Sequence, residues 1–401
     1  MKICLISDLH LSSNPRVWKE AKILSANGYD VTILTVFTDG ERKKKDLKIL
    51  EGYPIKYVGG INLIKEEVSV FKRFSYRTMA KFSKLVKQFL KMDTPWILGF
   101  SPSEMLEKAA AENADLYIAH TEYGMYIGNK LIERNKKVGY DFEDWYSHDY
   151  IVPFRPVSLL KRIEKFALET GAFCFCPSIA MAKGIQQQTG CNNKIDVIYN
   201  GFSINEKNLK TADVVKKSNS LIWFSQTIGA GRGIETMIEA LQFLDEKIEF
   251  HLLGNIDDDY KNSLIDLFSD KNGNQLIFHP TVNHNELLGF LSQFSIGLAL
   301  EQNYPESRDT TITNKILQYV QAGIKVLATD TKGQLEVATY FPELVEIVEL
   351  KDPKDWARGV AKLLNTPSVN EDITDQKFSE IFSLEAQEKK ILAAVSKALQ
   401  N

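Results

Sequence analysis

Short apolar runs alternate with helical stretches along almost the whole chain, and this alternation constrains the fold more than any other feature. "KICLIS" has the composition of a buried strand, and Asn14–Pro15 then supplies a helix N-cap and a proline at the first helical position. "DVTILTV" follows as the next strand and completes a β-α-β unit. Helical stretches at 71–91 and 156–170 separate the later strand-like runs, which predicts a mostly parallel sheet within the first 200 residues or so. Those later runs are "PIKYVGG", "ADLYIAH", "KKVGYDF", "AFCFCPS" and "KIDVIYNG".

The alternation restarts after a polar connector, "NGFSINEKNLKTADVVKKSNS". Strand-like runs then alternate with helical stretches at 233–244, 257–270, 284–293, 314–322 and 333–340, which predicts a second α/β domain. The final segment has the spacing of an amphipathic helix. A chain of 401 residues also exceeds what one hydrophobic core usually organises. We therefore expect an N-terminal domain over 1–198, a C-terminal domain over 199–380 and a C-terminal helix over 381–401 that packs on the N-terminal domain.

Charge and composition narrow the possible partners. A net charge of −3 gives no overall bias toward nucleic acid, so no nucleic-acid partner is expected. The chain has no apolar run long enough for a transmembrane helix, and an acid interrupts the apolar N-terminus too early for a signal peptide. These features predict a cytoplasmic location. The four cysteines then favour free thiols over disulfides.

The opening "SDLHLS" suggests a metal site but lacks the rest of one. With Asp8 and His10 it is similar to the first metal-binding loop of calcineurin-like metallophosphoesterases. A dinuclear centre needs about six or seven ligands, and the later segments of that superfamily are missing: no Gly precedes Asp or His in this chain. We interpret the match as coincidental and expect no metal. The acids at 257–259 fit helix capping better than a D-x-D metal motif.

Five segments resemble retaining, family-4-type GT-B glycosyltransferases, and they occur in that family's order. They are "SSNPRVWKEAKILSANGYDVTIL", "ADLYIAHTE", "KIDVIYNGFS", "SQTIGAGRGIETMIEAL" and "TNKILQYVQAGIKVLATDTKGQLEVA". The resemblance implies two tandem Rossmann-like domains facing a central cleft, with a C-terminal helix crossing back to the first domain. It also implies a metal-independent enzyme without a cofactor. Such an enzyme moves a sugar from a nucleotide-diphosphate donor to a glycan, polysaccharide precursor or glycolipid, with retention of configuration.

The segment "IGAGRGIE" has the features of a phosphate-binding loop. Gly229, Gly231 and Gly233 would let the backbone approach a diphosphate, and Arg232 opens a helix with a guanidinium suited to phosphate oxygens. Lys315 would supply a second cation at another helix start, beside Asn314. The alternatives are a plain glycine turn that caps a helix and a solvated lysine. By resemblance, Glu306 and Arg308 lie in the loop that positions the donor sugar, although such a loop is also simply polar.

A second group of candidates follows the strands of the first domain. His120 comes at the end of "ADLYIA", where doubly wound sheets place functional groups. By resemblance this histidine lies against the transferred sugar and the attacking hydroxyl, while Arg16, Glu122, Asp141 and Glu143 are expected to bind the acceptor. The alternatives are a core or surface histidine and solvated loop acids.

Two positions depart from the family pattern. Gln318 stands where a glutamate usually accepts both ribose hydroxyls, and Thr310 replaces the family's other acid. An amide loses the bidentate, charge-assisted geometry of a carboxylate. These changes leave a second function open, that of a catalytically weak sugar-nucleotide or glycan-binding partner in a glycosyltransferase complex.

Residues 71–91 form a basic amphipathic stretch. It contains seven basic residues, no acid and an apolar stripe, as helices that lie on anionic lipid do. This composition suggests peripheral contact with the inner face of the cell membrane. The family resemblance implies a role in polysaccharide biosynthesis, because members of that family often extend lipid-linked or polysaccharide acceptors. The alternative is a helix whose stripe is buried in the first domain.

Overall fold

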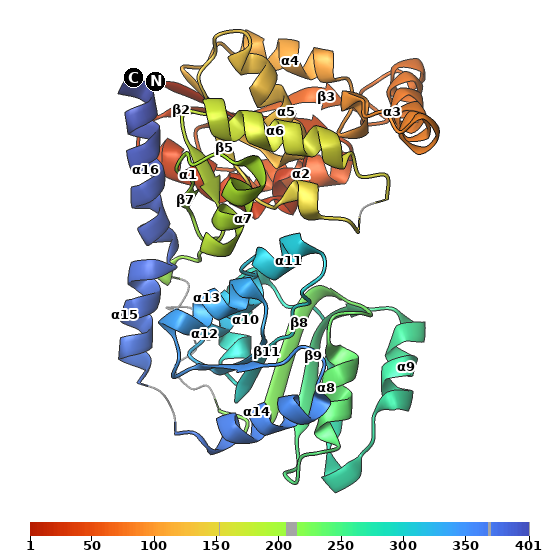
Figure 1. The fold of residues 1–401 in the computed structure, drawn as a ribbon, viewed down its shortest axis with the longest axis vertical. Coiled ribbons are helices and arrows are strands. Elements are labelled where there is room, and N and C mark those ends of the chain that lie inside the picture. Colours follow the sequence, from red (N-terminus) through yellow and green to blue (C-terminus); the bar gives the residue numbers. More distant parts are fainter. Residues whose placement is uncertain (152, 206–214, 368–369, 401) are drawn as a thin grey trace. The chain divides into compact units, whose positions relative to one another are not determined.

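The structure is a computed structural model that describes residues 1–151, 153–205, 215–367 and 370–400. These residues form two compact units (Figure 1). The first contains Met1–Ile198 and the C-terminal residues from Glu388 onward, and the second contains Tyr199–Gln387. Much of the predicted polar connector, 206–214, lies outside the described residues.

The first unit is built on a seven-stranded parallel sheet with the order β3-β2-β1-β4-β5-β6-β7. Strands β4 and β5 are completely buried and β1 is buried after its first residue, as expected for parallel strands covered by helices on both faces. The strands are β1 (Lys2–Ile6), β2 (Asp30–Phe37), β3 (Ile55–Asn62), β4 (Leu116–His120), β5 (Val138–Asp141), β6 (Cys174–Cys176) and β7 (Asp196–Val197). The helices are α1 (Pro15–Ala26), α2 (Gly40–Ile49), α3 (Val70–Leu90), α4 (Pro102–Ala111), α5 (Thr121–Ile132), α6 (Val157–Thr170) and α7 (Ile179–Thr189).

The second unit repeats this architecture with six parallel strands in the order β10-β9-β8-β11-β12-β13. The strands are β8 (Ser220–Ile228), β9 (Glu249–Ile256), β10 (Gln275–His279), β11 (Ile296–Ala299), β12 (Lys325–Thr329) and β13 (Val345–Val348). The helices are α8 (Ile234–Leu241), α9 (Asp258–Leu267), α10 (His284–Leu291), α11 (Glu306–Thr310), α12 (Asn314–Gln321), α13 (Lys332–Tyr340), α14 (Pro353–Asn365) and α15 (Glu371–Ile381). Together the two sheets confirm the predicted α/β class.

The last helix, α16 (Leu384–Gln400), begins in the second unit and continues into the first. In the first unit, Asn27 Nδ2 donates to Glu388 Oε1 over 2.8 Å, and Lys390 Nζ donates to the carbonyl of Val197 over 3.3 Å. The C-terminal end of the chain therefore belongs to the first unit, and Figure 1 shows the two labelled termini next to each other.

Local signals account for several elements. The side chain of Asn14 accepts from the backbone N–H of Val17, and Pro15 opens α1, as expected. Asp257 caps α9 and the next two acids lie in its first turn, which confirms the capping interpretation of that acidic run. All four cysteines are free. None of the helices in the described part of the chain could cross a membrane.

Both sheets reverse their strand order at one point. In the first unit the chain builds outward from β1 to β3 and then returns to place β4 on the other side of β1. In the second unit the same reversal occurs between β8 and β11. Open α/β sheets bind ligands beyond the carboxyl ends of the strands at such switch points. The loops after β1, β4, β8 and β11 are therefore where each unit is expected to carry its site.

Candidate functional site

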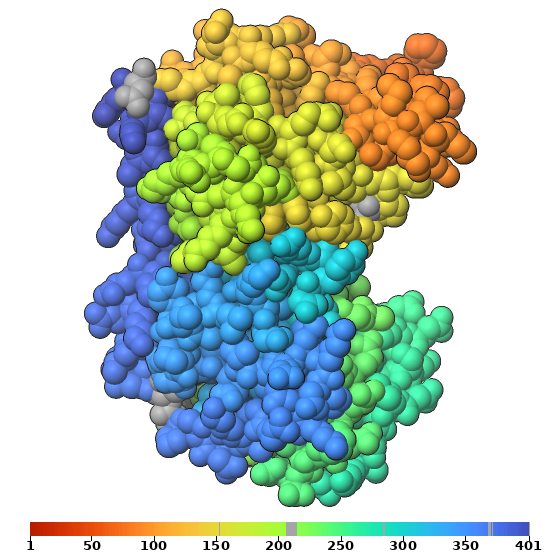
Figure 2. Space-filling model, in the orientation of Figure 1, coloured from red at the N-terminus to blue at the C-terminus, as the bar shows by residue number. Residues whose placement is uncertain are grey.

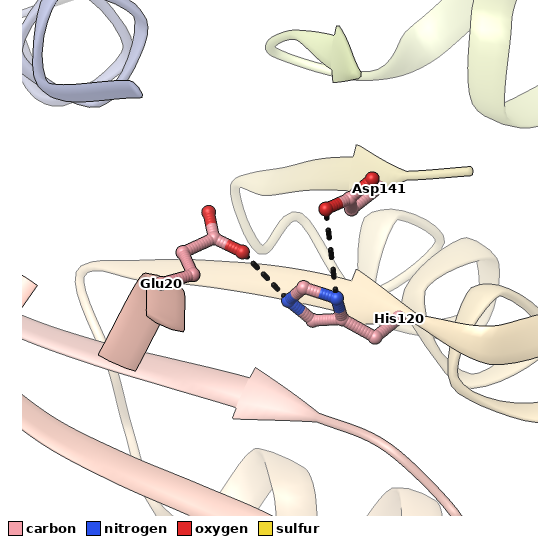
Figure 3. A group of neighbouring side chains, drawn as sticks. All are labelled: Glu20, His120 and Asp141. Carbon is pink, nitrogen blue, oxygen red and sulfur yellow. Dashed lines mark ion pairs between the residues drawn. The ribbon is translucent and has the colours of Figure 1, made fainter. Parts of the chain in front are cut away.

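A buried group of charged side chains lies at the switch point of the first unit (Figure 3). His120, the last residue of β4, points its Nε2 at Glu20 Oε2 of α1 over 2.8 Å. Its Nδ1 lies 3.0 Å from Glu143 Oε1 and 3.8 Å from Asp141 Oδ2. The imidazole therefore has carboxylates on both sides, and its side chain has no exposed surface.

Arg16 is the second cation of this group. Its Nε donates to Asp141 Oδ2 over 2.6 Å, and one of its terminal nitrogens donates to the carbonyl of Ile198 over 2.9 Å. Asn14 Nδ2 donates to both oxygens of Glu143, at 2.9 and 3.0 Å. The first turn of α1 and its N-cap thus hold the acids at the end of β5 and just after it. Four of the predicted residues come together here: Arg16, His120, Asp141 and Glu143.

The carboxylates determine the charge of His120. Burial by itself would lower the pKa of the imidazole, but Glu20, Glu143 and Asp141 raise it to about 10. Burial also raises the pKa of Glu20, although the charged imidazole opposes this. His120 is therefore an imidazolium at neutral pH. It cannot accept a proton as a general base while it holds these contacts.

Glu20, His120 and Asp141 could together hold a metal ion, because one ligand atom from each lies within 4.8 Å of the others. One imidazole and two carboxylates suit several divalent cations. However, Arg16 already donates to Asp141 Oδ2, the oxygen that lies 3.8 Å from His120, and His120 would first have to lose its proton. The chain's own cations thus fit this group better than a metal does.

Backbone strain marks the same position. Thr121, which follows His120 and begins α5, has a φ of 60°. A β-branched residue rarely adopts this conformation, and such outliers cluster at binding and catalytic sites. Glu143 is the member of the group with the most exposed side chain, at 15%, against 0% for His120 and 3% for Asp141. Glu143 is accordingly the group that a ligand can contact first.

Glu122 lies outside this group, unlike the other predicted acceptor residues. It pairs with Arg155 at 2.5 Å, and burial raises its pKa to about 7 despite that arginine. Sequence reasoning missed Glu20, Asn14 and Arg155. Glu20 could have been found, because it lies one helical turn after Arg16 and thus on the same face of α1.

The loop between β8 and α8 carries the predicted phosphate-binding residues. Gly231 and Gly233 have φ values of 72° and 80°, a region that favours glycine. A side chain at Gly233 would also meet Leu300 Cβ at 2.8 Å. Arg232 is half-buried, and its guanidinium donates to Ser225 Oγ over 3.3 Å. Among the described residues, Arg232 has no carboxylate partner, which leaves its charge available to an anion.

Lys315 lies at the start of α12, beyond β11, but it is not unpaired. Its Nζ lies 2.6 Å from Glu301 Oε1 and 5.5 Å from the centre of the buried Trp223 ring. Asn314 precedes it on the surface and accepts a hydrogen bond from Asn200. Because Leu300 packs under Gly233 and Glu301 holds Lys315, the residues after β11 connect the two predicted cations at the switch point.

The remaining donor-side candidates lie on α11 and α12. Arg308 is exposed, with no ion-pair partner among the residues that the structure describes, while Glu306 begins α11. Thr310 is buried and donates its hydroxyl hydrogen to carbonyls of its own helix. Gln318 is 5% exposed, on the second turn of α12. Gly229 has open space where a side chain would be.

The opening segment that resembles a metal loop uses its histidine structurally. His10 Nδ1 donates to Asp46 over 2.6 Å, and its Nε2 accepts hydrogen bonds from the backbone N–H groups of Thr38 and Asp39. Both ring nitrogens are therefore occupied within the fold. Asp8 lies after β1, and burial raises its pKa to about 6.

Solved structures share this fold over essentially the full chain. One is HepE from Anabaena in complex with UDP, with a TM-score of 0.70, 15% identity and coverage of 99% of this chain and 100% of the other. Another is sucrose-phosphate synthase from Thermosynechococcus elongatus, with a TM-score of 0.70, 14% identity and coverage of 100% and 99%. A third is a glycosyltransferase from Rickettsia africae, with a TM-score of 0.67, 15% identity and coverage of 100% of this chain and 99% of the other. The fold is therefore that of the GT-B glycosyltransferases, as predicted.

Sequence comparison adds no closer relative. No protein-family model matches the chain. No curated protein matches it either. At identities of about 15% the likeness establishes the fold, and the function has to be argued from the residues.

Proposed function

We propose that this protein is a glycosyltransferase that moves a sugar from a nucleotide-diphosphate donor to a hydroxyl of a glycan, a polysaccharide precursor or a glycolipid. The second unit binds the donor and the first unit binds the acceptor. The observation that carries the proposal is the guanidinium of Arg232, which has no carboxylate partner among the described residues and lies in a glycine loop at the switch point of the second sheet.

The donor's diphosphate is the natural ligand of that loop. Two glycines in the left-handed region lie directly ahead of α8, and the N-terminus of that helix adds N–H donors and a dipole that favour an anion. Arg232 supplies two parallel N–H donors that match phosphate oxygens. Gly229, Arg308, Glu306, Asn314 and Gln318 complete the proposed donor site. The bound UDP in HepE makes uridine diphosphate the first nucleotide to test.

Departure of the diphosphate is the step that the cations would assist. Negative charge develops on the leaving oxygens, and fixed positive groups stabilise it without reorganisation. Arg232 is free to do so. Lys315 must share its charge with Glu301, so we expect it to approach the diphosphate only by weakening a 2.6 Å ion pair.

The acceptor side depends on Glu143 and the buried charges that hold it. Glu143 receives hydrogen bonds from Asn14 and His120, which fix its orientation. Its remaining exposure lets it accept a hydrogen bond from a sugar hydroxyl. Arg16 and Asp141 keep the group together, and Glu122 would bind more remotely. A direct contact between His120 and the transferred sugar would require the imidazole to become uncovered.

Three finer features belong to the same proposal. Transfer retains the anomeric configuration, as the family resemblance implies. Donor binding needs no metal, because Arg232 provides the compensating charge. Residues 71–91 give peripheral contact with an anionic membrane, where a lipid-linked acceptor of polysaccharide biosynthesis would be found.

Calorimetric titration of the purified protein tests the donor half of the proposal. UDP, GDP, ADP and their common sugar conjugates are added in the presence of a chelator and then with Mn²⁺. Micromolar binding of one nucleotide in chelator is expected. Binding to none of them, or binding only with Mn²⁺, would contradict metal-independent recognition of the donor.

The second candidate function is that of a catalytically weak sugar-nucleotide or glycan-binding partner in a glycosyltransferase complex. One observation favours it: Thr310 and Gln318 stand where the resembling family has acids, and the Thr310 hydroxyl donates to carbonyls of its own helix. Nucleotide binding without hydrolysis or transfer to any acceptor would support this candidate. Turnover of the bound sugar nucleotide would exclude it.

A further inference from the structure

Helix α3 exposes an apolar stripe on the outer side of the first unit. Five of its large apolar side chains are between 49% and 83% exposed: Phe71, Phe74, Phe82, Leu85 and Phe89. They recur every three or four residues, with Thr78 between Phe74 and Phe82, so they lie on one face of the helix. Figures 1 and 2 show this segment in orange at the edge of the first unit, away from α16.

The opposite face attaches the helix to its unit. Tyr76 and Ser83 are the buried residues of α3. The Tyr76 ring packs against Trp96, and the Ser83 hydroxyl accepts from Thr94 over 2.8 Å. Residues two positions apart point to nearly opposite sides of a helix. Phe74 and Leu85 are two positions from Tyr76 and Ser83, so burial in this unit does not account for the stripe.

A row of basic side chains flanks the stripe on one side. Lys72 pairs with Glu104 and Lys87 with Asp93, and these pairs hold the helix to its unit. The other five basic residues have no carboxylate partner in the part of the chain that the structure describes. They are Arg73, Arg77, Lys81, Lys84 and Lys91. Arg77, Lys81 and Lys84 are spaced by four and three residues, which places them in a row beside the apolar stripe.

We infer that α3 lies in the surface of an anionic lipid bilayer, with the aromatic stripe inserted below the headgroups and the row of cations against the lipid phosphates. Contiguous exposed apolar surface is rare on monomeric proteins, and an amphipathic helix with one basic flank matches the chemistry of this interface. A protein partner or a second copy of the chain would have to offer an apolar groove bordered by acids. Within the described residues no carboxylate pairs with Arg77, Lys81 or Lys84, so the charge favours a surface that is uniformly negative. This inference does not depend on the proposed sugar transfer.

Vesicle co-sedimentation of the full chain tests the inference. Vesicles of phosphatidylcholine are compared with vesicles of equal parts of phosphatidylcholine and phosphatidylglycerol. Binding to the anionic vesicles alone, weakened by salt, is expected. Lys81→Gln with Lys84→Gln should weaken it about 10- to 30-fold, because each basic residue near the surface contributes roughly 1 kcal/mol. Lys183→Gln with Lys247→Gln changes the net charge equally at exposed positions elsewhere and should have little effect.

A second matched pair tests the apolar stripe. Phe82→Ser with Leu85→Ser removes side chains that are 57% and 49% exposed, and Phe243→Ser with Ile265→Ser removes side chains that are 51% and 48% exposed in the second unit. The first pair should lose vesicle binding while nucleotide affinity in lipid-free buffer stays unchanged, and the second should keep both. No binding by the unaltered chain, or equal binding to neutral vesicles, would overturn the inference. So would a dimer in solution that dissociates in the Phe82→Ser, Leu85→Ser variant without any vesicle binding.

Discussion

The guanidinium of Arg16 holds the carboxylate of Asp141 across 125 residues of sequence, with 2.6 Å between Nε and Oδ2. This contact joins the first helix to the end of β5, beside the switch point of the first sheet. Both side chains are at most 10% exposed. The neighbouring acids, Glu20 and Glu143, interact with Arg16 and with the other cation of the group, His120. The stability of the unit and the geometry of the proposed acceptor site are therefore linked.

Removal of Arg16 should therefore destabilise the protein strongly. Arg16→Met leaves Asp141 buried without its partner, and the loss of one member of a buried ion pair typically costs about 3–5 kcal/mol. Urea unfolding followed by circular dichroism measures the change. The double variant Arg16→Met, Asp141→Asn should recover part of it, because the uncompensated charge is gone. A loss below about 1 kcal/mol in Arg16→Met would show that other groups neutralise Asp141.

The charge of His120 gives a prediction about pH. Its pKa rises from 6.5 to about 10 on folding. A raised pKa means that the protonated form stabilises the folded state. This contribution is complete below pH 6.5 and is lost as the pH approaches 10. The free energy of unfolding of the unaltered chain, minus that of His120→Gln, should therefore fall over this interval. A difference that stays constant or grows would contradict an imidazolium at this position.

The architecture was predictable because strand and helix signals are local, but the site contacts were only partly so. His120 and Asp141 could be assigned to a site because they end apolar runs. The pairing of Glu122 with Arg155 and the contact of Lys315 with Glu301 join side chains from separate segments, so no local pattern encodes them. Helix α5 contains two glycines, Gly124 and Gly128, which lower its helix propensity. Side chains at these glycines would meet Ile6 O at 2.6 Å and Ala119 Cβ at 2.9 Å, so close packing on the sheet requires glycine there.

The proposed donor site can be tested at Arg232. Arg232→Ala should weaken binding of the preferred nucleoside diphosphate by roughly 10- to 100-fold, as expected for hydrogen bonds to a charged group worth about 1.5–3 kcal/mol. Arg358→Ala is the matched control, since Arg358 is an exposed arginine of the same unit that pairs with Asp355. Calorimetry compares the two variants. Equal affinities would remove Arg232 from the proposed donor site.

Gln318 allows a test in which affinity is gained. If this position faces the donor's ribose, the carboxylate introduced by Gln318→Glu should accept hydrogen bonds from both ribose hydroxyls. Affinity for the nucleotide should then rise by about tenfold, since charge-assisted hydrogen bonds are roughly twice as strong as neutral ones. Affinity for the 2′,3′-dideoxynucleotide should not rise, because it offers no hydroxyl. Equal gains for both nucleotides would place the effect elsewhere. The free energy of unfolding is measured alongside, because Gln318 is 5% exposed and a new carboxylate there carries a burial cost.

Two glycines of the proposed phosphate loop should respond differently to the same change. Gly233→Ala places a side chain at φ 80° and 2.8 Å from Leu300 Cβ, so a loss of about 1–3 kcal/mol in unfolding free energy is expected, together with weaker nucleotide binding. Gly229→Ala meets open space and should change stability by less than about 0.5 kcal/mol. If Gly229→Ala nevertheless weakens nucleotide binding at unchanged stability, the diphosphate approaches the backbone there. Equal stability losses in both variants would contradict the loop geometry itself.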